Sequence, residues 1–338
     1  MKPSSSSQRV GYYPKQPEEV RAPSKGRSNV LVRRCAFLLC VGVFLVSAFC
    51  LIRYFANIAV TKRASRELEA VYASAQETAP MATPLATALP TPALTPAPTS
   101  APKERRAAQA TPSVDALWPT TYRHNPSLRV SAVFYELQRK NEDIVGWLKI
   151  DGLLEEAVCQ RDNSYYLTHN ALKQQSVTGA LFLDEACDLK TVPTQMVIHG
   201  HNMKEGAMFG SLKKYKVKDA SFYHQHPFIE FNTLYENGRY VIFAVCEVDL
   251  RHSQPDYLPF WQHVRFSSVE AFEAYVEKAR TLSHYRCGVT VEPSDRLLTL
   301  STCIGEDENK RLLVMARRIR DDENELELNM AVYGTGDR

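Results

Sequence analysis

The stretch "LLTLSTCIGEDENKRLLVMARRI", residues 297 to 319, holds two apolar runs separated by a charged loop. Both runs are short and rich in Leu, Val, Ile and Thr, which is typical of β-strands bounded by a turn. Cys303 ends the first run and Arg311 opens the second. A hairpin-like return would bring the Arg311 guanidinium beside the Cys303 thiol. We therefore predict two neighbouring strands that carry a candidate reactive cysteine.

Similar short runs recur from about residue 115 onward, separated by turns. Eight short strands favour a closed or nearly closed barrel, so we predict an α+β fold with an eight-stranded β-barrel core. The runs are 145–150, 155–160, 178–184, 194–200, 227–233, 239–248, 296–302 and 311–319.

Two segments predict peripheral helices, residues 126–140 and residues 268–282. Ser267 and Glu270 form a predicted capping box at the start of the second helix. One apolar face is expected on that helix, made of Val269, Phe272, Val276 and Ala279.

An uncharged segment near the N-terminus predicts one transmembrane helix. Residues 35–52, "CAFLLCVGVFLVSAFCLI", carry no charge and as a helix span roughly 27 Å, enough to cross the hydrocarbon core of a bilayer. Residues 1–34 hold eight Lys or Arg against two Glu, so the positive-inside rule predicts a cytoplasmic tail and an extracellular remainder. The alternative is a cleaved signal peptide, whose basic region is normally shorter. The basic excess is local, since the whole chain carries +3, and nucleic acid is not implied.

Residues 53–114 are a predicted stalk and linker to a folded domain at 115–338. A short helix can continue over 54–78, and residues 80–102 hold seven prolines with no charge and no glycine. This composition favours polyproline II, which at about 3.1 Å per residue reaches on the order of 70 Å. The segment is either a spacer that holds the domain away from the membrane or a disordered tether.

The eight cysteines divide between the anchor and the rest of the chain. Cys35, Cys40 and Cys50 lie in the anchor. The number beyond the anchor is odd, so at least one thiol there is free or pairs between chains. No C-x-x-C pair with matching ligand spacing occurs, and a structural zinc site is not expected. The five cysteines beyond the anchor are Cys159, Cys187, Cys246, Cys287 and Cys303.

Thiol catalysis needs a nucleophile, a proton-transfer partner and a donor to the developing oxyanion. Taken alone, Cys303 would more often be a buried sheet cysteine. Taken alone, Arg311 is about as often a surface residue whose partner is one of the acidic residues Glu306, Asp307 and Glu308.

The stretch "VIHGHNMKEGAMFG" supplies the proton carrier, because His199 and His201 stand where a strand-like run gives way to a loop. A histidine there can titrate near neutral pH. The competing interpretation, a metal held by these two histidines, lacks further ligands at a recognisable spacing.

The order of the histidine and the cysteine along the chain distinguishes families of thiol enzymes. No histidine follows residue 284, whereas papain-type proteases place theirs after the nucleophile. This chain runs His, Cys, Arg, and with TLSTC it resembles the sortases, membrane-anchored cysteine transpeptidases of Gram-positive surfaces. The resemblance is to class B over about residues 125–320, where the long insert between 249 and 296 also fits that class. It is carried by NEDIVGWLKI (141–150), DNSYYLTHN (162–170), GALFLD (179–184), GHNMKEGAMFGSLKKY (200–215) and TLSTC (299–303).

The resemblance implies site residues and no cofactor or metal. Its catalytic residues are His201, Cys303 and Arg311. Four further residues would line a groove for the substrate: Asn163, Leu167, His199 and Ser301. Two positions depart from the class, since His199 stands where tyrosine is common and Gly305 where some members have an acidic residue. We expect both to alter substrate choice.

The resemblance also implies the reaction. Cys303 attacks a threonine carbonyl in the C-terminal sorting signal of a surface protein, Arg311 steadies the oxyanion, and His201 protonates the leaving amine. An amine of a cell-wall peptide then resolves the thioacyl enzyme, which joins the protein to peptidoglycan or its precursor. Two alternatives stay open: a catalytically silent, membrane-tethered peptide-binding module, and a hydrolase that resolves the thioacyl with water. The sorting motif, the acceptor amine and the client proteins do not follow from the sequence.

Overall fold

The computed structural model describes residues 27–78, 117–204, 206–216, 220–305 and 307–333. The proline-rich segment 80–102 and most of the basic tail fall outside these ranges. The chain divides into two compact units, Met1–Arg53 and Tyr54–Arg338. One long helix, α1 (Arg27–Thr78), contributes to both units.

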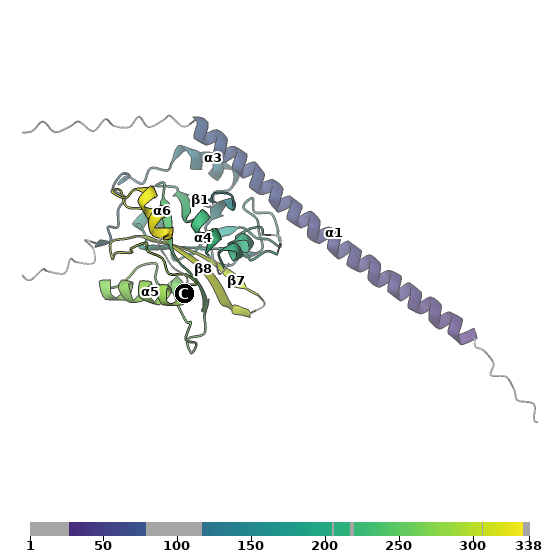
Figure 1. The fold of residues 1–338 in the computed structure, drawn as a ribbon. Helices are drawn as coiled ribbons and strands as arrows, with labels where there is room; N and C mark the ends of the chain where they lie inside the picture. The colour runs from purple at the N-terminus through teal and green to yellow at the C-terminus, as the bar shows by residue number, and fades with distance from the viewer. Residues whose placement is uncertain (1–26, 79–116, 205, 217–219, 306, 334–338) are drawn as a thin grey trace, which may run out of the picture. The chain divides into compact units, whose positions relative to one another are not determined.

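The second unit is built on a closed barrel of eight strands, which confirms the predicted fold. Figure 1 labels three of these strands, β1, β7 and β8. Around the barrel the order is β1-β2-β3-β4-β7-β8-β6-β5. The pairs β2–β3 and β4–β7 are parallel, and the other neighbours are antiparallel. The strands are β1 (Ile144–Ile150), β2 (Leu154–Cys159), β3 (Leu181–Leu183), β4 (Gln195–His199), β5 (Phe228–Thr233), β6 (Arg239–Asp249), β7 (Leu297–Ile304) and β8 (Asp307–Arg318).

Short helices occupy the connections between strands. The α-helices are α3 (Ala132–Lys140), α4 (Ser221–Gln225), α5 (Val269–Leu282) and α6 (Glu325–Tyr333). The 3₁₀ helices are η1 (Tyr165–Leu167), η2 (Leu189–Thr191), η3 (Phe209–Lys216) and η4 (Phe260–Gln262).

The first predicted helix, 126–140, is shorter than expected, because α3 begins only at Ala132. The preceding residues form a turn instead. Leu128 adopts a left-handed φ of 51°, and the side chain of Asn125 accepts a hydrogen bond from the Arg129 amide at 2.9 Å. A helix cannot run through a left-handed residue, so the turn delays its start.

The predicted capping box of α5 is wrong by one residue. Ser268, not Ser267, is the N-cap, and its hydroxyl accepts a hydrogen bond from the Ala271 amide. Phe272, Val276 and Ala279 are buried as predicted, Val269 is only half-buried, and Tyr275 completes the face. Ser267 and Ser268 are equally good caps by residue type, so the sequence alone does not distinguish them.

The part of α1 from Tyr54 onward is helical, as the sequence predicted, and one face of it is buried. Tyr72 stacks on Trp147 of β1, with ring centroids 4.2 Å apart and an interplanar angle of 8°. The Tyr72 hydroxyl also accepts a hydrogen bond from the Asn232 side chain at 2.9 Å. The buried face consists of Ile58, Thr61, Ala64, Leu68, Tyr72 and Ala75. Residues 54–78 therefore pack on the barrel.

A partly buried carboxyl group, Glu156 of β2, lies under this part of α1. Burial raises its pKa to about 7, a hydrogen bond from Ser65 opposes the rise, and the charge of Glu69 adds to it. The folded protein keeps this proton up to about pH 7, whereas an unfolded glutamate releases it near pH 4.5. The free energy of unfolding therefore falls as pH rises between these values and stays reduced above them.

Glu156→Gln is expected to stabilise the protein at pH 8 by about 1 to 2 kcal/mol and to leave it unchanged at pH 4. Each pKa unit is worth about 1.4 kcal/mol, and the partly exposed edge of the side chain reduces the full effect. Chemical denaturation at the two pH values measures the difference. Glu273→Gln, at an exposed position of α5, is the matched control. An equal gain at both pH values would show that the buried charge is not the cause.

Candidate active site

Strands β7 and β8 lie side by side (Figure 1). Their register brings Cys303 and Arg311 together, as the sequence predicted. The two residues are register partners. The register shifts directly after them, and Gly305 turns the chain with a left-handed φ of 60°. Cys303 is half-buried at the end of its strand. The thiol is therefore neither sealed in the core nor fully in solvent.

The hairpin's own backbone holds the Arg311 guanidinium. Its Nη1 donates to the carbonyl oxygens of Glu308 and Lys310. Asp307 pairs instead with Arg251, at 3.1 Å. Across the described residues, which omit residue 306, no carboxylate forms an ion pair with Arg311. The edge ion pair weighed as an alternative is thus not observed for Asp307 or Glu308.

His201 lies on the loop after β4, where hydrogen bonds fasten that loop to β7. The Asn202 side chain donates to the Cys303 carbonyl at 2.9 Å, and the Thr302 hydroxyl donates to the Gly200 carbonyl at 2.7 Å. The Gly200 amide donates to the Ser301 carbonyl at 3.2 Å. The histidine loop and the cysteine strand are therefore one connected piece of structure.

The His201 ring is held from its other side by the turn of η1. Its Nε2 lies 2.8 Å from the carbonyl oxygen of Leu167. A carbonyl only accepts, so Nε2 carries a proton and donates it, which leaves Nδ1 as the nitrogen that can exchange a proton. Gly179 packs against the same ring, because a Cβ there would stand 3.1 Å from His201 Cδ2 and 2.4 Å from the Tyr166 carbonyl oxygen.

The His199 ring forms a hydrogen bond with a residue that the sequence analysis did not predict. Its Nε2 lies 2.9 Å from Oδ2 of Asp184, which also accepts from the Asn163 side chain at 3.2 Å. Burial raises the pKa of Asp184, but hydrogen bonds from His199 and from the Ala186 amide outweigh it, so the pKa lies below its usual range. This carboxylate stays charged and orients the His199 ring.

Two further candidates lie in the same region. Ser301 is the register partner of His199, and its hydroxyl is buried without a hydrogen-bond partner among the described residues. Leu167 leaves 39% of its surface exposed. Through these contacts the structure links all seven residues predicted for the site. The residues missed by the sequence analysis are Asp184, Asn202, Thr302 and Gly179. Each stands inside or beside a motif quoted above. That position was the only feature of the sequence that could have indicated a role in the site.

The second unit holds four other cysteines, and their thiols have raised pKa values. Burial raises the pKa of the Cys187 and Cys246 thiols to about 12 and raises the pKa of Cys159 and Cys287 as well. Such thiols stay protonated near neutral pH and are poor nucleophiles. Among the described residues, no group of three or more His, Cys, Asp or Glu side chains is placed to share a metal ion.

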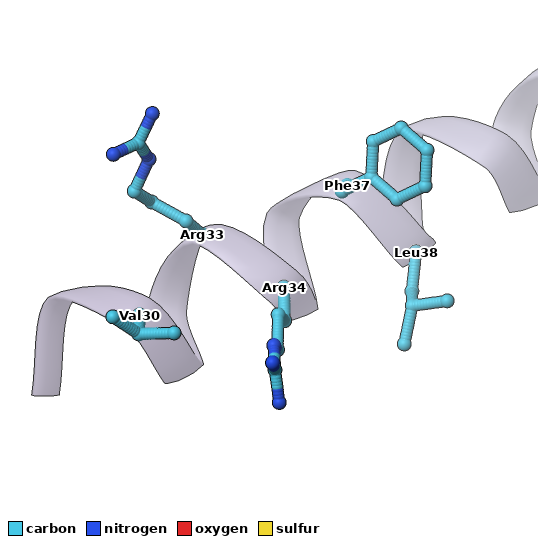
Figure 2. Close-up of a pocket in the computed structure, with 5 residues that line it drawn as sticks. All are labelled: Val30, Arg33, Arg34, Phe37 and Leu38. Atoms are coloured by element: carbon cyan, nitrogen blue, oxygen red, sulfur yellow. The ribbon is translucent and has the colours of Figure 1, made fainter. Parts of the chain in front are cut away.

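Within Met1–Arg53, α1 presents an apolar surface. Figure 2 shows Arg33 and Arg34 projecting from the helix about one turn before Phe37 and Leu38. Phe37 and Leu38 each expose 67% of their surface. Of the helices that the structure describes, this is the one long and apolar enough to cross a membrane.

A half-buried thiol opposite an arginine on the neighbouring strand, with a histidine on a loop tied to the cysteine strand, is an arrangement that suits a cysteine enzyme. A family model described as a sortase domain matches residues 148–319. Sortase B of Listeria monocytogenes is 35% identical over 175 residues, which cover 51% of this chain and 68% of that protein. Sortase B of Staphylococcus aureus is 28% identical over 172 residues, covering 50% and 67%.

Solved structures of sortase B are also similar to this chain. A Staphylococcus aureus sortase B–substrate complex matches with a TM-score of 0.51 at 27% identity, covering 57% of this chain and 88% of that chain. The chain therefore belongs to the sortase family, as a class B sortase and cysteine transpeptidase.

Proposed function

We propose that this sortase cleaves the C-terminal sorting signal of a partner protein after threonine and transfers the protein to an amine of a cell-wall peptide. Cys303 Sγ attacks the threonine carbonyl, a C–S bond forms, and the peptide bond breaks as His201 protonates the leaving amine. The acceptor amine then attacks the thioacyl carbonyl, and the sulfur leaves.

The observation that carries this proposal is the register of β7 and β8, which sets Arg311 opposite Cys303. Arg311 Nη1 is engaged by backbone carbonyls, so its remaining N–H groups are the donors for an oxyanion. The tie between Asn202 and the Cys303 carbonyl supports His201 as the proton carrier on the same side. Nucleophilic attack, stabilisation of the oxyanion and protonation of the leaving amine thus each have a residue of suitable chemistry.

The test is a peptide-library cleavage assay on the full chain in detergent micelles, run with and without an amine acceptor. A ligated product and a Cys303 thioacyl adduct, both identified by mass spectrometry, are the expected results. Binding without cleavage would indicate the silent binding module. Identical hydrolysed products with and without the amine would indicate the hydrolase.

Ser301, with Asn163, Leu167 and His199, is proposed to line the sorting-signal groove. The Ser301 hydroxyl, which is buried and has no hydrogen-bond partner among the described residues, supports this role, because a peptide backbone group that reached it would satisfy it. Ser301→Ala is expected to raise the KM for the peptide about 3- to 10-fold with little change in kcat, the worth of one hydrogen bond. Steady-state kinetics measure both constants. A lowered kcat with unchanged KM would contradict the assignment.

We also propose that residues 35–52 anchor the protein with residues 1–34 in the cytoplasm and residues 115–338 outside. The basic residues at the start of α1 support this orientation. Protease added to intact cells should digest residues 115–338 and spare residues 1–34, as read with antibodies to each end. Protection of residues 115–338 would reverse the orientation.

A further inference from the structure

We propose that Asn57 and Thr61 of α1 are positioning residues for His201. The part of α1 that follows the predicted membrane span would then take part in catalysis as well as in tethering. This inference rests on the role proposed above for His201. It concerns the segment predicted from sequence as a stalk.

The first step is a pair of contacts between α1 and the loop that precedes β3. The side chain of Asn57 donates to the Gln175 carbonyl at 3.1 Å and accepts from the Val177 amide at 2.7 Å. Both ends of one amide group therefore hold the same loop. Val177 exposes half of its surface, so little apolar packing holds the loop at this point.

The second step is a buried row of hydroxyl groups. Oγ1 of Thr61 lies 2.6 Å from Oγ of Ser176, which lies 2.8 Å from Oγ1 of Thr178. All three side chains are at most 4% exposed. A buried hydroxyl that loses its partner costs about 1 to 3 kcal/mol, so the row favours a single position of the loop.

The third step joins this loop to the support of the histidine. The Ser176 amide donates to the Thr168 carbonyl at 2.8 Å, and the Ala180 amide donates to the Tyr166 carbonyl at 2.9 Å. Between these two contacts lies Leu167, whose carbonyl oxygen accepts from His201. The η1 turn is therefore fastened on both sides of the carbonyl that orients the ring.

Gly179 leaves this connection little room to adjust. Its φ of 59° is left-handed, and an added Cβ would lie 2.4 Å from the Tyr166 carbonyl oxygen and 3.1 Å from His201 Cδ2. A shift of the loop at Ser176 is thus passed to the η1 turn and to the histidine ring. A displacement of about 1 Å in a catalytic group can cost on the order of 10²-fold in rate.

A second region of the same helix offers the comparison. Tyr72 packs on Trp147 and accepts from Asn232, and neither of these residues belongs to the loop or to the η1 turn. If the helix only braces the barrel, substitutions at Thr61 and at Tyr72 should have the same effect on kcat. If it positions the histidine, the loss of kcat should be confined to substitutions at Asn57 and Thr61.

The experiment measures kcat, KM and thermal unfolding for the full chain in detergent micelles with a cleavable sorting peptide. Thr61→Val and Asn57→Ala are expected to lower kcat about 10-fold with KM changed less than about 2-fold. Thr61→Ser, which keeps the hydroxyl, is expected to retain kcat. Tyr72→Phe is the matched control and should retain kcat. Asn57 is only half-buried, so its variant keeps the test open if Thr61→Val folds poorly.

Unchanged kcat per folded molecule in Thr61→Val and Asn57→Ala would overturn the inference and leave the helix as a brace. Equal loss of kcat in Thr61→Ser or in Tyr72→Phe would overturn it as well. His201→Ala with normal turnover would overturn the proposed function and this inference together. An inactive His201→Ala beside a fully active Thr61→Val would overturn this inference alone.

Discussion

Cys303→Ala is expected to abolish both peptide cleavage and formation of the thioacyl adduct, with turnover reduced by a factor on the order of 10⁶. The thiol is the only proposed nucleophile, and no neighbouring group on β7 can form the same covalent intermediate. Loss of one half-buried sulfur atom should change the free energy of unfolding by less than about 1 kcal/mol. Mass spectrometry of the peptide-treated protein and thermal unfolding measure the two effects separately.

The four other cysteines of the second unit are the matched controls. Burial raises the pKa of each of these thiols, so each is expected to tolerate alanine with turnover per folded molecule intact. A small cavity costs each variant about 1 kcal/mol of stability. If Cys303→Ala instead unfolded the protein while its folded fraction kept specific activity, Cys303 would be a core residue. The controls are Cys159, Cys187, Cys246 and Cys287.

The barrel could be predicted from sequence because each strand is marked locally. Short apolar runs bounded by turns need no knowledge of their neighbours, and all eight were found within a few residues. The pairing of Cys303 with Arg311 was also predictable, since it depends only on the return of one hairpin. The start of α3 was missed because the left-handed turn at Leu128 leaves no apolar pattern.

The packing of α1 on the barrel could not be predicted, since its partners lie far away in the sequence. Thr61 meets Ser176, and Tyr72 meets Trp147, across long separations that no local pattern reports. The contact of His199 with Asp184 likewise depends on the antiparallel register of β3 and β4. Local patterns thus predict elements and motifs, whereas side-chain partners depend on how the elements are placed.

Arg311→Lys is expected to be nearly as damaging as Arg311→Ala, with turnover reduced about 10²- to 10³-fold. The reason is geometric. Nη1 of Arg311 already serves the carbonyls of Glu308 and Lys310, and the planar guanidinium still has other N–H groups to offer an oxyanion. A lysine has one nitrogen, which cannot hold the hairpin carbonyls and also reach the reacting carbonyl in a fixed plane.

Lys310→Gln is the matched control for this test, because Lys310 is exposed, cationic and adjacent on β8. Arg317 cannot serve, since it is fully buried in an ion pair with Glu323 and its loss would destabilise the barrel. Steady-state cleavage of one sorting peptide by the folded variants gives the comparison. Near-normal turnover in Arg311→Lys, beside inactive Cys303→Ala and His201→Ala, would make the arginine a structural residue. The oxyanion would then need another donor in the same hairpin, for which backbone amides near Cys303 are the remaining source.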